Sequence, residues 1–131
     1  MDLPDPSIIT AVLDLYARYA HRIDRRDFDG FAELFTEDAE LVVGDSSCRG
    51  RAAVPEFMAG LMKTPGGAHI ITNVSVRPDG NDRWSVIADY LLTRRPEPEA
   101  PWGIVAAGWY ESVTTWAGGE WYFAAHRIMF R

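Results

Sequence analysis

Hydrophobic residues in the first part of the chain recur at intervals of three and four. Ser7 follows two prolines and is a residue type typical of a helix N-cap. The stripe that follows it consists of Ile8, Val12, Leu15, Tyr16, Tyr19 and Ile23. This spacing predicts one long amphipathic helix that ends near Asp24.

Two shorter helices and one strand are predicted next. Asp27 is placed as the N-cap of a second helix, whose apolar face would carry Phe28, Phe31, Leu34 and Phe35. A strand is expected over 39–43, followed by a small polar loop over 44–50. A third helix is expected over about 52–62, because Val54, Phe57, Met58 and Leu61 again mark one buried face.

The second half of the chain changes to an extended pattern. Segments 68–77, 84–94, 103–116 and 121–130 are rich in Val, Ile, Thr, Tyr and Trp. Turn-forming residues separate them, such as Gly118 and Gly119 before the last segment. Long strands after a block of helices predict an α+β fold with a strongly curved sheet wrapped around the helices. Residues 1–131 are expected to form a single domain.

Composition and charge narrow the function classes. The chain has 131 residues, 47% of them hydrophobic, and a net charge of −6. An acidic surface repels phosphate backbones and anionic lipid, so we expect neither nucleic acid nor membrane partners. The lone Cys48 excludes an internal disulfide, and the N-terminus carries no signal-peptide pattern. These features predict a soluble cytoplasmic protein.

Asp24 is the first residue that local rules leave unexplained. It continues the apolar flank of the first helix and lies at the helix C-terminus, where the macrodipole disfavours an anion. Its carboxylate therefore needs a partner. The partner is either a structural one, such as Arg25 or Arg26 in a surface ion pair, or a functional one.

His69 is the second such residue, at the start of the segment HIITNV after a Gly-Gly break. Strand alternation puts His69, Ile71 and Asn73 on one face. If that face meets the helices, an imidazole projects into an apolar interior. A buried histidine held only by a structural hydrogen bond is the alternative.

Other polar residues add less. Tyr19 lies about one and a half helical turns before Asp24 and either reaches the same cavity or belongs to the core. His21, His69 and His126 show no metal-ligand spacing, so no metal is expected. Cys48 has no histidine at motif spacing and is not expected to act as a nucleophile.

Three stretches together resemble the SnoaL-like proteins of the nuclear-transport-factor-2-like superfamily. They are YAHRIDRRDFDGFAELFTEDA at 19–39, AHIITN at 68–73 and GEWYFAAHR at 119–127. The resemblance runs over nearly the whole chain and implies a cone-shaped α+β barrel, with three N-terminal helices packed in a curved, mostly antiparallel sheet. It does not by itself fix the reaction, because this fold hosts many activities.

Within the superfamily the chain is most similar to the branch of scytalone dehydratase, hexachlorocyclohexane dehydrochlorinase and bile-acid 7α-dehydratase. That similarity implies a catalytic dyad of Asp24 and His69, with Tyr19 matching a tyrosine of the bile-acid enzyme. Val43 stands where ketosteroid isomerase has its aspartate, which argues against steroid isomerisation. Asp89 resembles one acid of limonene epoxide hydrolase, but Ile87 replaces that enzyme's arginine.

The prediction is a cofactor-independent, dehydratase-type lyase that acts on a small hydrophobic cyclic or polyketide-like substrate. A cyclase or isomerase with the same base is one alternative. The other is a non-catalytic binding or assembly module like the β subunit of ring-hydroxylating dioxygenases. A homodimer through the outer sheet face is also expected. The residues expected to bind substrate are Tyr16, Val43, Phe57, Leu61, Asn73, Asp89 and Tyr110.

Overall fold

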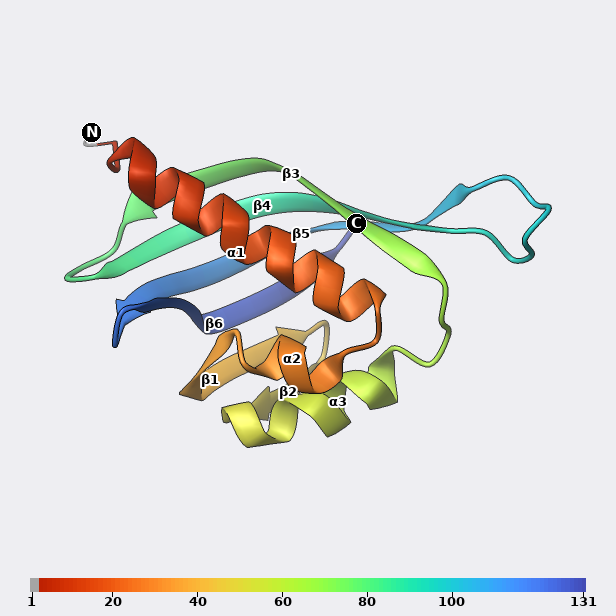
Figure 1. The fold of residues 1–131 in the computed structure, drawn as a ribbon, viewed down its shortest axis with the longest axis horizontal. Helices are drawn as coiled ribbons and strands as arrows, with labels where there is room; N and C mark the ends of the chain where they lie inside the picture. Colours follow the sequence, from red (N-terminus) through yellow and green to blue (C-terminus); the bar gives the residue numbers. More distant parts are fainter. Residues whose placement is uncertain (1–2) are drawn as a thin grey trace.

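Helix α1 (Pro6–Asp24) lies across one face of a six-stranded sheet in the computed structural model, which describes residues 3–131 (Figure 1). Its N-cap is Asp5 and not Ser7. The Asp5 carboxylate accepts a hydrogen bond from the Ser7 backbone N–H at 2.8 Å, and Pro6 occupies the first helical position, where no donor is needed. The helix ends at Asp24, as its apolar stripe predicts.

Helix α2 (Phe28–Ala32) is shorter than predicted. Asp27 caps it by accepting from the Gly30 N–H at 2.9 Å. The Leu34 carbonyl already accepts from the Phe123 N–H at 2.8 Å, so sheet pairing ends the helical segment. Strand β1 (Phe35–Val43) therefore begins four residues before the predicted strand.

The predicted polar loop after β1 contains a strand that the sequence pattern did not indicate. Strand β2 (Ser46–Arg49) turns back after Gly44, whose φ is +58°, and pairs antiparallel with β1. The predicted third helix is a short 3-10 turn, η1 (Arg51–Ala53), followed by α3 (Val54–Leu61). In Figure 1, α2 and α3 lie together beside β1 and β2, and α2 follows the C-terminal end of α1.

The four predicted C-terminal strands match the structure to within one residue at each end. They are β3 (Gly67–Pro78), β4 (Arg83–Arg94), β5 (Gly103–Ala117) and β6 (Glu120–Phe130). The strand order is β2-β1-β6-β5-β4-β3, with β1 and β6 parallel and every other pair antiparallel. The α+β prediction is confirmed, and the curved sheet stays open between β2 and β3.

Aromatic side chains fill the space between the helices and the sheet. Tyr16 stacks on Tyr110 with ring centroids 6.0 Å apart, and Tyr110 stacks on Tyr90 at 4.7 Å. Tyr19 packs against Phe31 at 4.8 Å. The sequence predicts an apolar cavity in this place, but the interior is packed with these side chains.

The outer face of the sheet is less aromatic than predicted. Trp84 and Trp121 pack against the core on the helix side, and Trp116 contacts Trp121 with centroids 5.7 Å apart. The tyrosines at 16, 19, 90 and 110 are buried in the core. Among residues 3–131, no helix has both the length and the apolar character to cross a membrane.

Candidate active site

Asp24 occupies the last position of α1 and turns its carboxylate toward the start of β3. Oδ1 lies 2.6 Å from Nδ1 of His69, and both carboxylate oxygens accept from the His69 backbone N–H at 3.1 Å. In the described part of the chain, neither Arg25 nor Arg26 forms an ion pair with Asp24. His69 is therefore the partner of the Asp24 carboxylate at the C-terminus of α1.

His69 is held in one orientation by this contact. Its side chain is 9% exposed and that of Asp24 is 20% exposed, so the pair lies at the edge of the interior. A carboxylate beside Nδ1 fixes the proton on that nitrogen and leaves Nε2 with a free lone pair. Within residues 3–131, Nε2 has no hydrogen-bond partner.

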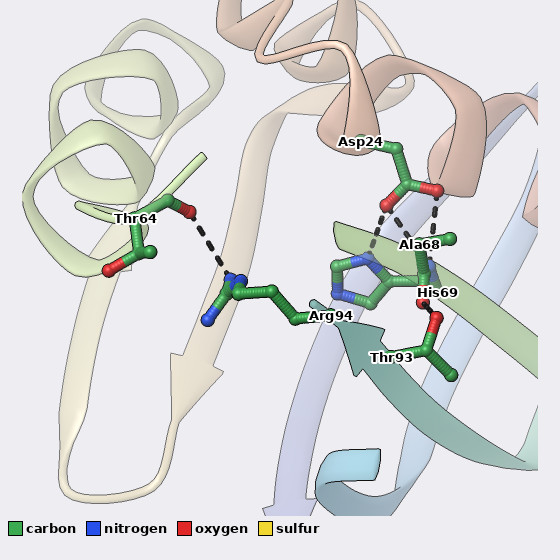
Figure 2. A network of polar contacts seen from close by, with 6 residues as sticks. All are labelled: Asp24, Thr64, Ala68, His69, Thr93 and Arg94. Atoms are coloured by element: carbon green, nitrogen blue, oxygen red, sulfur yellow. Dashed lines mark hydrogen bonds and ion pairs between the residues drawn. The ribbon is translucent and has the colours of Figure 1, made fainter. Parts of the chain in front are cut away.

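The dyad lies in a narrow cleft closed by the segment from Met62 to Gly66. Figure 2 shows the Asp24–His69 pair and the Arg94 side chain, which extends from near the imidazole toward Thr64. Arg26 Nη1 donates to the Met62 carbonyl at 2.5 Å, and Arg94 Nη2 donates to the Thr64 carbonyl at 3.2 Å. The cleft has a volume of about 10 Å³, so a ligand larger than one water can enter only when this segment moves.

A groove lies between α1 and the free edge of β3, and His69 is one of its lining residues. Its volume is about 320 Å³, at the lower end of the range for small-molecule sites. Tyr16 and His21 are its other polar lining residues. The apolar lining residues are Leu13, Ala17, Ala20, Ile70, Ile71 and Val74.

A buried polar network behind the dyad was not predicted. Tyr16 donates to Ser112 Oγ at 2.7 Å, Ser112 Oγ lies 2.7 Å from His126 Nδ1, and His126 Nε2 lies 2.9 Å from the Tyr19 hydroxyl. Burial lowers the pKa of His126 to about 3 and raises the pKa of both tyrosines. Strand alternation offers a signal for this network, since Ser112 and His126 both fall on buried positions of their strands.

Tyr19 accordingly belongs to that network and not to the dyad. Its side chain is 1% exposed and its hydroxyl is bonded to His126. Of the two places predicted for Tyr19, the cavity of the dyad and the core, the structure therefore has the core.

Two predicted substrate-binding residues lie on the outer sheet face. The ladder between β3 and β4 shifts register between Thr72 and Ser75, and Asn73 there has a φ of +54°. This bulge turns the Asn73 side chain outward, where its Nδ2 donates to Asp89 at 2.8 Å. Asp89 also pairs with Arg131 at 3.1 Å, and these bonds lower its pKa. Both predictions are corrected.

The remaining predicted lining residues are scattered. Tyr16 shares the groove with His69, whereas Tyr110 is buried in the aromatic core. Val43 and Phe57 pack against that core, and Leu61 is 42% exposed at the end of α3. Within residues 3–131, no group of three or more His, Cys, Asp or Glu side chains could hold a metal ion.

The chain has an α+β fold that it shares with solved structures described as having a cystatin-like fold, one of them an NTF2-like protein. A family model for the SnoaL-like domain matches residues 7–127, and the chain belongs to this family. A comparison with curated proteins finds no significant match.

Solved structures share the fold at low sequence identity. Aln2 from a Streptomyces species is 22% identical with a TM-score of 0.89, covering 98% of this chain and 94% of its own. A Mycobacterium tuberculosis protein of unknown function is 26% identical, with a TM-score of 0.83 and coverages of 94% and 71%. A candidate scytalone dehydratase from Novosphingobium aromaticivorans is 22% identical, with a TM-score of 0.82 and coverages of 95% and 85%.

Proposed function

We propose that the chain is a cofactor-independent lyase of the dehydratase type in which His69 is the general base. The observation that carries this proposal is the 2.6 Å contact between Asp24 Oδ1 and His69 Nδ1. The other ring nitrogen, Nε2, has no hydrogen-bond partner among the described residues. A carboxylate in this place holds the tautomer that can accept a proton at Nε2. It also stabilises the imidazolium that then forms.

The proposed reaction removes water from a β-hydroxy carbonyl compound. His69 Nε2 takes the proton from the carbon next to the carbonyl, and the C–H electron pair moves into an enolate. The enolate reforms the carbonyl as the hydroxyl on the neighbouring carbon leaves. The leaving hydroxyl takes the proton back from Nε2 and departs as water, so the histidine ends in its starting state.

The proposed substrate is a small hydrophobic cyclic or polyketide-like molecule. Its support is the apolar groove of about 320 Å³ next to His69 and the membership of the SnoaL-like family. The substrate would displace the segment from Met62 to Gly66, whose Met62 and Thr64 carbonyls accept from the side chains of Arg26 and Arg94.

Cyclic β-hydroxy ketones, with and without a ring carboxylate, test the base. 3-Hydroxycyclohexanone is the smallest, and its enone product is followed by ultraviolet absorbance.

His69→Asn should lower kcat by about 10²-fold or more, since general base catalysis contributes a factor of about 10² to 10⁴ to the rate. Asp24→Asn should lower it by a smaller factor. Asp14→Asn changes an exposed carboxylate of the same helix, paired with Arg18 outside the groove, and should leave turnover unchanged. Turnover by a folded His69→Asn variant at the wild-type rate contradicts the assignment.

The filled interior favours one second candidate, a binding or assembly module without catalysis. Tyr16, Tyr19, Tyr110, Phe31 and Phe35 are all exposed by 2% or less, so among residues 3–131 these side chains fill the space between the helices and the sheet. A solved structure that shares the fold is the β subunit of a candidate aromatic-ring-hydroxylating dioxygenase from Novosphingobium aromaticivorans. Absence of turnover on every hydroxy ketone would favour this role. Deuterium uptake from D₂O into the ketones without loss of water would instead favour an isomerase or cyclase.

A further inference from the structure

Arg94 carries a buried N–H donor that nothing in the protein uses. Among the described residues, its Nε is the one buried side-chain nitrogen or oxygen without a hydrogen-bond partner. The side chain lies at the end of β4 and lines the cleft of Asp24 and His69. Buried polar groups are nearly always hydrogen-bonded, so an unpartnered guanidinium donor at a cleft indicates a ligand acceptor.

Gly67 allows the start of β3 to approach the end of β4 closely. It is the cross-strand partner of Arg94 in the β3–β4 ladder. A Cβ on residue 67 would lie 3.6 Å from Arg94 Nε and 2.9 Å from the Thr93 carbonyl oxygen. The short distance to the Thr93 carbonyl shows that the two backbones approach closely only because residue 67 is glycine. This approach brings the Arg94 side chain beside the start of β3, two residues from His69.

The charges that line the cleft favour an anion. They are one carboxylate, Asp24, and two guanidinium groups, Arg26 and Arg94, which gives +2 − 1 = +1 with a neutral His69. The whole chain carries −6, so this cleft has the opposite sign to the protein's net charge. A partly desolvated positive site of this kind attracts an oxyanion more strongly than a neutral carbonyl.

We propose that Arg94 binds a carboxylate of the ligand, and that the site therefore takes small hydrophobic organic acids. This inference rests on the proposed function in placing the ligand beside His69 and in the movement of the segment from Met62 to Gly66. The Nε and Nη2 donors lie along one edge of the guanidinium and can bind both oxygens of a carboxylate. Nε has no partner, and a carboxylate reaches it when the segment from Met62 to Gly66 moves, at which point Nη2 would exchange its 3.2 Å bond to the Thr64 carbonyl for the second oxygen.

Benzoate and benzamide test this inference because they match in shape and differ in charge. A titration of the full ¹⁵N-labelled chain, followed by NMR, should give a Kd for benzoate at least 10-fold below that for benzamide. The Arg94 Nε–H and Gly67 N–H signals should move with benzoate. Equal affinity for both probes, no binding of either, or shifts confined to signals elsewhere in the protein would overturn the inference.

Variants separate the guanidinium edge from charge alone. Arg94→Gln should remove the preference for benzoate, and Arg94→Lys should restore only part of it, since an ammonium lacks the two-donor edge. Arg95→Gln is the matched control, because Arg95 stacks over Trp102 at 5.2 Å and should leave the preference intact. An unchanged preference in a folded Arg94→Gln variant contradicts the proposal.

The two proposals fail in different ways. His69→Asn should abolish turnover while the benzoate preference persists, because Arg94 is retained. If turnover does not depend on His69, the lyase proposal fails and the carboxylate site stands. If Arg94→Gln keeps the preference while His69→Asn abolishes turnover, only the carboxylate inference fails.

Discussion

At the scale of single residues, burial and hydrogen-bond partners give His69 and His126 different roles. His69 lies at the edge of the interior, with a carboxylate on Nδ1 and no protein partner on Nε2 among the described residues. His126 is 1% exposed, and its two ring nitrogens contact Ser112 and Tyr19. The first arrangement leaves a nitrogen for chemistry, whereas the second uses both nitrogens to satisfy buried hydroxyls.

The pKa of His126 predicts how stability depends on pH. Burial lowers it from 6.5 to about 3, so the folded state stays neutral at this site while the unfolded state takes up a proton below about pH 6.5. The free energy of unfolding should therefore fall as the pH falls, by about 2 kcal/mol between pH 7 and pH 5 from this group. Urea unfolding at these pH values measures the loss.

Two variants isolate this contribution. His126→Gln removes the titrating ring and should flatten the dependence between pH 7 and pH 5. His21→Gln removes an exposed histidine and should retain it. If His126→Gln loses as much stability as the wild type over this interval, the dependence arises elsewhere.

At the scale of elements, close approach between strands decides which residues the sheet tolerates. A Cβ on Gly108 of β5 would lie 1.9 Å from the Met129 carbonyl oxygen and 2.8 Å from the Tyr90 ring. This glycine therefore lets β6 and the Tyr90 ring approach, and it keeps Tyr90 stacked on Tyr110 at an interplanar angle of 8°.

Gly108→Ala should consequently destabilise the fold by about 3 kcal/mol, because backbone must shift to admit the methyl group. Gly60→Ala is the matched control. Gly60 lies in α3 with no atom within 4 Å of its added Cβ, so alanine there should stabilise the protein by about 0.5 to 1 kcal/mol. Thermal and urea unfolding of both variants measure the difference, and a neutral Gly108→Ala would contradict the argument.

Element types were predictable from the sequence where one periodicity persisted over many residues. The long stripe predicted the end of α1 at Asp24, and β-branched and aromatic residues predicted the last four strands. Irregularities depended on contacts between distant segments. The early end of α2 follows from a hydrogen bond to Phe123, and the outward turn of Asn73 follows from a bulge against β4. Local pattern contains neither.

At the scale of the whole molecule, the sequence predicted the approach of Asp24 to His69 but not the space around them. Helix position and strand start define where the two backbones lie, and the family resemblance singles out the same pair. How far the interior is filled depends on the directions of many tyrosine and phenylalanine side chains. The unpaired Nε of Arg94 likewise arises from the tertiary arrangement of Gly67, Thr64 and β4.

The outer sheet face supplies the argument for a homodimer. A groove of about 420 Å³ crosses it, lined in part by Val42, Val113 and Ala125, and Ile87 there is 54% exposed. Arg127 and Glu111 face each other across the β5–β6 ladder, yet neither forms an ion pair within residues 3–131. A two-fold axis over this face would bury the apolar residues and bring each charge near its opposite on the other copy.

We therefore expect a dimer at micromolar concentration, measured by sedimentation equilibrium. Ile87→Glu should dissociate it, because the new carboxylates would be desolvated across the axis beside apolar residues. Ile104→Glu changes an isoleucine that is 65% exposed near the projecting turn between β4 and β5, and it should leave the mass unchanged (Figure 1). A wild-type monomer at this concentration would contradict the expected dimer. A dimer that survives Ile87→Glu but not Ile104→Glu would show that the interface lies outside the outer sheet face.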